Sequence, residues 1–341
     1  MRMARGAYES LILKQTRTRA QFESSPKLPR RGKSFSVVGM RRILFQAGAA
    51  FALCVFGVPA ARAMLASNDG VVSHNTDPST ARTDISELWN RTAKLVAGTG
   101  TYLGQAADGT RWVLTAAHVS SLSGTITDTS GATHALDQDA SVSAIRLINP
   151  NGSAADLKLF AVTPGNDATA AYLDALGSVD VFTGTLYTNT PLWVVGTGQS
   201  TELGGSFKSG YKRQKQWAEF CADDTETVSG DPCIVETFSR SGASVQCTNQ
   251  DSGSGAFVKN GDVWKLVGVA VGVGGNGNTT KIGFVEDATA ENPAVFATYF
   301  IDLAPYAEQI RAIMAIPEPG AFSLFAGTLA LAFCASRRRR R

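Results

Sequence analysis

Three side chains suited to nucleophilic catalysis lie far apart in the 341-residue sequence. His118 ends the segment TAAH, Asp156 begins DLKLF, and Ser252 lies within DSGSG. A serine hydroxyl is a poor nucleophile at neutral pH unless an imidazole accepts its proton, and a carboxylate must fix the tautomer of that imidazole. The order His, Asp, Ser is one in which such triads occur. Separations of 38 and 96 residues mean that only a folded domain can bring these side chains together.

The elements that would position these residues are mostly strands. Short apolar and β-branched runs alternate with Gly, Asn, Asp and Ser turns, which predicts an all-β sandwich or barrel. One helix is predicted over 303–313, because Tyr306, Ile310 and Ile313 follow helical spacing and Asp302 can cap its start. The predicted strands are 94–103, 112–117, 143–148, 156–162, 179–184, 192–198, 255–260, 263–273 and 281–285.

The segments around the three residues resemble the motifs of the trypsin-like (chymotrypsin-fold) serine peptidases. RWVLTAAHV is similar to the histidine motif of that family, ADLKLFAV to its Asp-hydrophobic-x-Leu motif, and DSGSGAF to its Gly-Asp-Ser-Gly-Gly motif. VFATYFIDLAPYAEQI resembles its last strand and closing helix. The resemblance covers most of 94–314. It implies an all-β fold of two packed six-stranded antiparallel barrels with a C-terminal helix.

The resemblance also implies roles for individual residues. His118 would act as general base and then acid, Asp156 would orient it, and Ser252 would attack the scissile carbonyl. The backbone N–H groups of Gln250 and Ser252 would form the oxyanion hole. The family has glycine at the position of Gln250, and a residue with a side chain reaches the required backbone conformation less easily. Ser254 replaces the second glycine of the motif.

Substrate binding and activation can be placed in the same way. The primary specificity pocket would lie near Val245 and Gln246, and neither is acidic, so a preference for Arg or Lys is unsupported. Val271, within GVAVGV (268–273), would belong to the strand that pairs with substrate. In the family the aspartate before the nucleophile, here Asp251, often pairs with a freed N-terminal ammonium. Val71–Val72 is a weak candidate for that terminus, and the alternative is another partner for Asp251.

Charge is distributed unevenly along the chain. The net charge of +3 combines a net of +10 in residues 1–63, +4 in 316–341 and −11 in 64–315. The acidic central part argues against a nucleic-acid binder, whose folded domain carries a basic face. With 44% hydrophobic and 18% charged residues, the chain suits a packed globular domain. The central part, 64–315, is predicted to be the peptidase domain.

The N-terminal segment 1–63 is predicted to end in a secretory signal peptide. Arg41 and Arg42 precede an apolar run from Ile43 to Ala60, and Ala61-Arg62-Ala63 is a small-x-small cleavage site. A compact signal of this kind would begin at Met40, which we take as the candidate true start. The alternative is an uncleaved signal anchor, although the run contains Gly57 and Pro59 and is shorter than the ~20 residues of a span.

The C-terminal segment 316–341 has three parts in order: Pro317-Glu318-Pro319, an apolar stretch over 320–335, and the arginines 337–341. This layout resembles the PEP-CTERM sorting signal of Gram-negative bacteria, which an exosortase is thought to process. An ordinary C-terminal anchor is the alternative. Both place the domain outside the cytoplasm, in the periplasm, the outer membrane or at the cell surface, with membrane contact only through the terminal segments.

Cysteine and histidine usage limits the other options. The central part contains Cys221, Cys233 and Cys247, so one disulfide at most is predicted there, and the sequence does not choose the pair. Their spacing fits no zinc pattern, and no metal or other cofactor is expected.

Two functions follow as hypotheses. The first is an exported serine endopeptidase that hydrolyses polypeptides through an acyl-enzyme. The second is a catalytically inactive surface module that keeps the fold for binding, with Gln250 as the sign of a decayed oxyanion hole.

Overall fold

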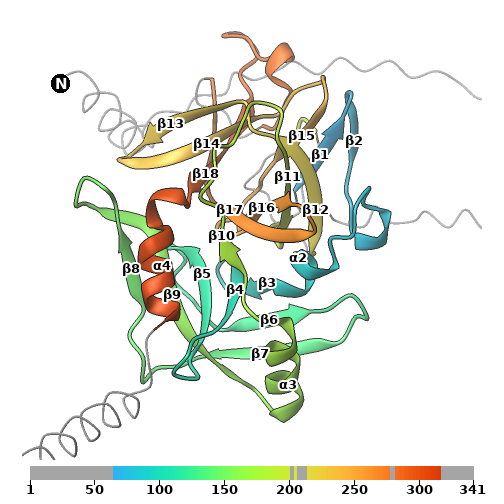
Figure 1. Cartoon of the computed structure of the whole chain (residues 1–341). Coiled ribbons are helices and arrows are strands. Elements are labelled where there is room, and N and C mark those ends of the chain that lie inside the picture. Colours follow the sequence, from blue (N-terminus) through green and yellow to red (C-terminus); the bar gives the residue numbers. More distant parts are fainter. Residues whose placement is uncertain (1–63, 200–202, 206–212, 277–280, 316–341) are drawn as a thin grey trace, which may run out of the picture. The chain divides into compact units, whose positions relative to one another are not determined.

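The computed structural model describes residues 64–199, 203–205, 213–276 and 281–315 (Figure 1). The chain divides into two compact units, Met1–Phe56 and Gly57–Arg341, and all described residues belong to the second. The predicted signal peptide and sorting signal therefore lie outside the described residues. Within the part that is described, no helix is long and apolar enough to cross a membrane.

The first half of the domain is a closed six-stranded barrel. Its sheet runs in the order β5-β4-β3-β6-β7-β9, and pairing of β5 with β9 closes the ring, while β8 pairs with the outer part of β9. The ladder is antiparallel throughout. The strands are β3 (Thr92–Leu95), β4 (Thr99–Gln105), β5 (Arg111–Ala116), β6 (Gly124–Thr127), β7 (Thr133–Gln138), β8 (Ile145–Ile148) and β9 (Ala154–Pro164).

The second half is a longer sheet with the path β12-β11-β16-β17-β18-β14-β13, and β10 joins β17 in parallel. A small sheet, β15-β1-β2, accompanies it, and β15 lies beside both β12 and β14. The two sheets thus surround one core. Their strands are β1 (Leu65–Asn68), β2 (Val71–Ser73), β10 (Asp180–Val181), β11 (Pro191–Gly196), β12 (Gln216–Cys221), β13 (Asp224–Val228), β14 (Asp231–Thr237), β15 (Ala243–Gln246), β16 (Gly255–Asn260), β17 (Val263–Gly275) and β18 (Val295–Asp302).

The strands that lead to the predicted site are buried on both faces. In β5, Val113 packs inside the first barrel, whereas Leu114 packs in the cluster shared with the second half. In β9, Phe160 and Leu159 divide between the same two clusters. Because successive side chains of a strand point to opposite faces, a strand between two cores reads as a continuous apolar run. This explains the unbroken apolar runs WVL (112–114) and LFAV (159–162).

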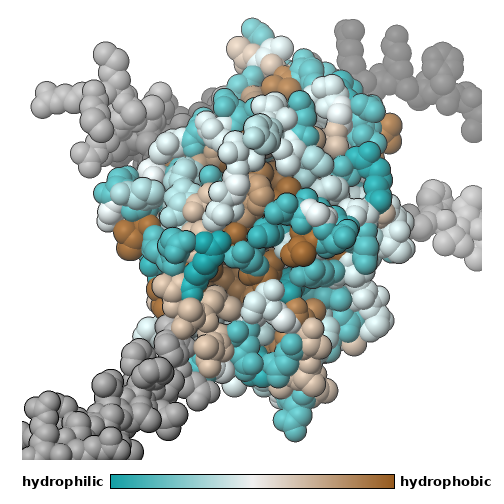
Figure 2. All heavy atoms as spheres, in the orientation of Figure 1, coloured by the Kyte–Doolittle hydropathy of each residue, from teal (hydrophilic) through white to brown (hydrophobic). Residues whose placement is uncertain are grey.

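The described part of the domain also contains three helices: α2 (Ser86–Arg91), α3 (Asp167–Leu176) and α4 (Ala307–Met314). Three short 3-10 turns, Pro78–Thr80, Val285–Asp287 and Ala304–Tyr306, are also present. Helix α4 lies beside β8 and β9 in Figure 1 and buries Ile310 and Ile313 in the shared cluster. On the face seen in Figure 2, most of the surface is polar, and apolar atoms gather near its middle, between the two halves.

The all-β fold with a C-terminal helix is confirmed, with corrections in detail. The helix of 303–313 is confirmed as the 3-10 turn followed by α4, whereas α2 and α3 were not predicted. Segment 281–285 is not a strand. Ile282 forms a single bridge with Val295, and Ile282 and Phe284 pack with Leu65 and Phe238 in a small separate cluster. The apolar side chains of Ile282 and Phe284 thus hold a loop against the domain and do not form a strand.

Candidate active site

His118 and Asp156 form a close pair at the end of the first barrel. β5 ends two residues before His118, and the strand register holds Asp156 opposite, because the Ala117 N–H donates to the Asp156 carbonyl at 2.9 Å. One carboxylate oxygen accepts the backbone N–H of His118 at 2.9 Å, and the other lies 2.7 Å from the imidazole Nδ1. An ionised carboxylate only accepts hydrogen bonds, so Nδ1 carries the proton. The imidazole Nε2 is then the unprotonated nitrogen of the neutral ring and can act as a base.

A buried network that joins the two halves supports Asp156. The Asp156 backbone N–H donates to the Asp231 carboxylate at 3.1 Å, and the other oxygen of Asp231 accepts from the Asn149 amide at 2.7 Å. The Tyr306 hydroxyl donates to the Asn149 side-chain oxygen. Asp231, Asn149 and Tyr306 are all buried. Sequence reasoning missed these residues, since Asp231 sits in no motif and lies 75 positions from Asp156.

Ser252 lies in a tight turn that leads into β16. The Ser252 carbonyl accepts the Thr99 N–H at 2.8 Å, and the Gly253 N–H donates to Ala270 at 2.7 Å. A Cβ placed on Gly98 would lie 2.7 Å from the Val119 side chain and 2.9 Å from the Ser252 carbonyl. Gly98 therefore lies close both to the turn that bears Ser252 and to Val119, the residue that follows His118.

Two backbone donors of this turn have no partner. Among the described residues, neither the Gln250 N–H nor the Ser252 N–H donates a hydrogen bond, although neighbouring N–H groups of the turn do. Gln250 has a φ of +71°, the left-handed conformation that glycine adopts most easily. For a residue with a Cβ this conformation costs of order 1–3 kcal/mol and persists only where the surroundings enforce it.

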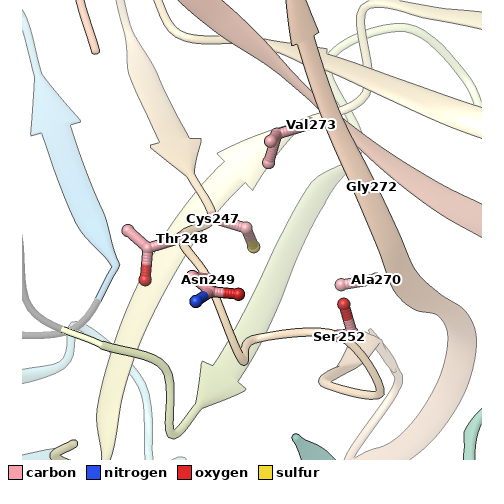
Figure 3. A pocket seen from close by; sticks show the side chains of 7 residues that line it. All are labelled: Cys247, Thr248, Asn249, Ser252, Ala270, Gly272 and Val273. Carbon is pink, nitrogen blue, oxygen red and sulfur yellow. The ribbon is translucent and has the colours of Figure 1, made fainter. Parts of the chain in front are cut away.

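Beside Ser252 lies a small open pocket of about 140 Å³. Figure 3 shows Ser252 and Ala270 at one end of it and Val273 at the other. None of its lining side chains is charged: they are Cys247, Thr248, Asn249, Ser252, Ala270, Gly272 and Val273.

Val245, Gln246 and Val271, which were predicted to bind substrate, do not line this pocket, whereas residues adjacent to them in the sequence do. Val245 and Gln246 are fully buried, and the Gln246 amide donates to the Cys247 carbonyl at 3.0 Å. Val271 alternates with Ala270 and Gly272 along β17 and packs against the core clusters. The sequence located the correct strands, but only the three-dimensional register distinguishes a lining residue from its neighbour.

Comparison with known proteins agrees with this architecture. The trypsin family model matches residues 104–295, which is more than half of the chain.

The chain belongs to the trypsin family.

Among solved structures, the chain is similar to neuropsin, a serine protease expressed in the limbic system of mouse brain. The two are 18% identical, the match covers 67% of this chain and 96% of that chain, and the TM-score is 0.44. No curated protein sequence matches this chain. The resemblance to trypsin-like serine peptidases, which rested on the motifs, is confirmed at the level of the family.

Asp251 of this trypsin-family chain is a completely buried carboxylate with internal partners. It accepts hydrogen bonds from the Gly198 N–H at 2.7 Å, the Thr248 N–H at 2.9 Å and the Thr248 hydroxyl at 3.0 Å. Burial raises the pKa of Asp251 from 3.8 to about 6, against the opposing effect of these donors and of Arg213. Val71, the candidate new terminus, is 70% exposed within the β1–β2 hairpin.

The structure does not support the predicted disulfide. Cys221, Cys233 and Cys247 are all free thiols. Cys221 ends β12, Cys233 lies in β14 opposite Glu226 and Ile301, and Cys247 follows β15. Burial raises the pKa of Cys233 to about 12 and also raises that of Cys247. Such thiols pack as small apolar side chains and are unreactive.

The Gly253→Ala substitution is expected to destabilise the turn. A Cβ at Gly253 would lie 1.8 Å from the Thr99 carbonyl oxygen. Gly261→Ala is the matched control, because Gly261 also has a positive φ but nothing lies within 4 Å of its Cβ position. In denaturant titrations, we expect Gly253→Ala to lower the free energy of unfolding by about 1–3 kcal/mol more than the control. Equal losses would contradict the close packing of the turn on Thr99.

The raised pKa of Asp251 predicts a pH dependence. Below about pH 3 the carboxyl is protonated in both the folded and the unfolded state, whereas above pH 6 the folded protein must bury its charge. Stability should therefore fall by roughly 3 kcal/mol between pH 3 and pH 7, relative to Asp251→Asn, which does not titrate. Denaturant titrations of both proteins across this range measure the difference. Parallel stability curves would contradict the assignment.

Proposed function

We propose that the chain is a serine endopeptidase in which His118, Asp156 and Ser252 form the catalytic triad. The observation that carries this proposal is the His118–Asp156 pair, in which the Asp156 carboxylate hydrogen-bonds to both the backbone N–H and the imidazole Nδ1 of His118. This pairing holds the ring at the end of the first barrel, and Gly98, which lies close to Val119 and to the Ser252 carbonyl, links this end of the barrel to the turn that bears Ser252. The neutral ring then has its basic nitrogen free.

The proposed reaction has two halves. His118 takes the hydroxyl proton as the Ser252 oxygen attacks the peptide carbonyl, and Asp156 stabilises the imidazolium that forms. The tetrahedral intermediate collapses to an acyl-enzyme when His118 returns the proton to the leaving amine. Water, activated by the same imidazole, then releases the second product and regenerates the hydroxyl.

The unpaired N–H groups of Gln250 and Ser252 support an oxyanion hole. Each such donor is worth about 2.7–4 kcal/mol in enzymes where it has been removed. A glycine is not required at position 250 as long as the backbone is held at a positive φ, and Gln250 has that conformation here. This favours the enzyme over the inactive binding module, in which the turn would have no reason to keep a strained residue.

The site favours an extended polypeptide with an uncharged side chain next to the cut bond. Among the described residues, β16 pairs with β17 only as far as Val269, and the stretch of β17 from Gly272 to Gly275 pairs only with β18. The free side of β17, which begins at Val271, can accept a peptide as an added strand. The pocket beside Ser252 would take the neighbouring side chain, and its lining offers a cationic or anionic group no opposite charge.

The terminal segments support a proposed localisation for this enzyme. The basic, apolar ends flank an acidic domain, which supports export through the signal peptide and retention at the envelope or surface of a Gram-negative bacterium. Processing of the C-terminal tail by exosortase-type machinery is part of the same proposal.

A fluorophosphonate probe tests the proposed function directly. The purified chain should be labelled at neutral pH, and intact mass and peptide mapping should place one adduct on Ser252. Ser252→Ala should show no labelling, and Ser254→Ala, two residues away, should be labelled like the wild type. Folded wild-type protein that stays unlabelled across neutral pH would contradict the proposal and favour the binding module.

A further inference from the structure

Thr99 of the first barrel holds the turn that bears Ser252 with two separate groups. Its backbone N–H donates to the Ser252 carbonyl at 2.8 Å, and its hydroxyl donates to the Gln250 carbonyl at 3.0 Å. Thr99 is fully buried at the start of β4. The two carbonyls flank Asp251, so a single residue fixes both ends of the central part of the turn.

The Thr99 hydroxyl is itself held by Thr197, which follows β11 in the second half. The Thr197 N–H donates to the Thr99 oxygen at 3.2 Å, and the two hydroxyl oxygens are 2.7 Å apart. A hydroxyl has one proton to donate and two lone pairs. Because the Thr99 proton goes to Gln250, the proton between the two hydroxyls must come from Thr197.

Arg213 sets the direction of this chain of hydrogen bonds. Its Nη2 donates to the Thr197 hydroxyl at 2.9 Å, and a guanidinium can only donate. The protons therefore run in one order, from Arg213 to Thr197, to Thr99 and to the Gln250 carbonyl. The Thr99 hydroxyl uses its proton and both lone pairs, and the reverse direction would leave the Thr197 proton without an acceptor among these groups.

The remaining donors of Arg213 fasten the same region. The guanidinium donates to the carbonyls of Leu95, Val96 and Gly98, which belong to the β3–β4 hairpin that carries Thr99, and to the Thr197 carbonyl at 2.8 Å. All five N–H groups of Arg213 are thus used on the hairpin and on Thr197. Arg213 links the first barrel to the second at the point where the turn must be held.

We propose that Arg213, Thr197 and Thr99 are positioning residues, which hold Gln250 in its left-handed conformation so that the N–H groups of the turn stay available for catalysis. The inference rests on the proposed peptidase function. The network would replace the freedom of a glycine: the chain has a side chain at position 250, and the hydrogen bond to its carbonyl keeps the backbone where a glycine would rest unaided.

Thr99→Val tests this proposal, because valine keeps the branched shape and removes the hydroxyl. The control is Thr101→Val, since the Thr101 hydroxyl is equally buried and has no hydrogen-bond partner among the described residues. We expect Thr99→Val to slow fluorophosphonate labelling of Ser252 by about tenfold to a hundredfold, the order expected when a reacting group is displaced by about 1 Å. Thr101→Val and Thr99→Ser should label at the wild-type rate.

A second background separates positioning from a general loss of structure. Gly is at ease with a positive φ, so Thr99→Val should slow labelling much less in a Gln250→Gly protein than in the wild type. An equal loss in both backgrounds, or a wild-type rate for Thr99→Val, would overturn the proposal. If Thr99→Val does not fold by circular dichroism, Thr197→Val carries the same test, since it breaks the series one step earlier.

The controls also separate this proposal from the proposed function. If the wild type itself is not labelled at Ser252, the peptidase assignment fails and the positioning role fails with it. If the wild type is labelled and Thr99→Val labels equally fast, only the positioning role fails.

Discussion

The hydrogen bonds from Thr99 to the turn of Ser252 are the interaction on which the site depends. His118 and Asp156 belong to the first barrel, whereas Ser252 belongs to the second half. A catalytic arrangement across two halves is only as well defined as their junction. Thr99 binds the Ser252 carbonyl directly, and the apolar cluster shared by β5, β9, β11 and β17 fixes the halves around this contact.

The turn combines strain with burial, and both have a physical reason. The turn leaves two backbone N–H groups without partners, so its own backbone hydrogen bonds do not hold its conformation. Other residues must therefore support it. Asp251 supplies part of this support with a buried carboxylate that accepts from Gly198 and Thr248. The pKa of Asp251 is raised because this carboxylate is buried away from water, which disfavours its charged form. Preorganised donors of this kind lower the barrier because they need not reorganise during the reaction.

The sequence was sufficient to predict the fold class and the three proposed catalytic residues. Each of these residues lies in a short local motif that can be recognised in a single sequence. It did not show Asp231, which contacts Asp156 across 75 positions, or Arg213, which contacts Thr197 across 16 positions and Gly98 across 115. Neither residue sits in a recognisable pattern. Helix α3 was missed because its apolar residues are mostly alanines and only Thr169 and Leu173 are buried, and because its cap, Asn166, resembles an ordinary turn residue. The predicted disulfide was wrong because the number of cysteines only limits how many disulfides are possible. The positions of β12, β14 and β15 decide whether two thiols meet, and Cys221, Cys233 and Cys247 are all free.

The central claim is that the backbone N–H groups of Gln250 and Ser252 stabilise the oxyanion of a serine peptidase. A crystal structure of the Ser252 adduct with a peptidyl boronic acid tests it most directly. The account predicts a boronate oxygen about 2.7–3.1 Å from both nitrogens, with the Thr99 hydroxyl still on the Gln250 carbonyl. A Gln250 N–H that points away from the boronate, with inhibitor bound and the Thr99 contact intact, would contradict it.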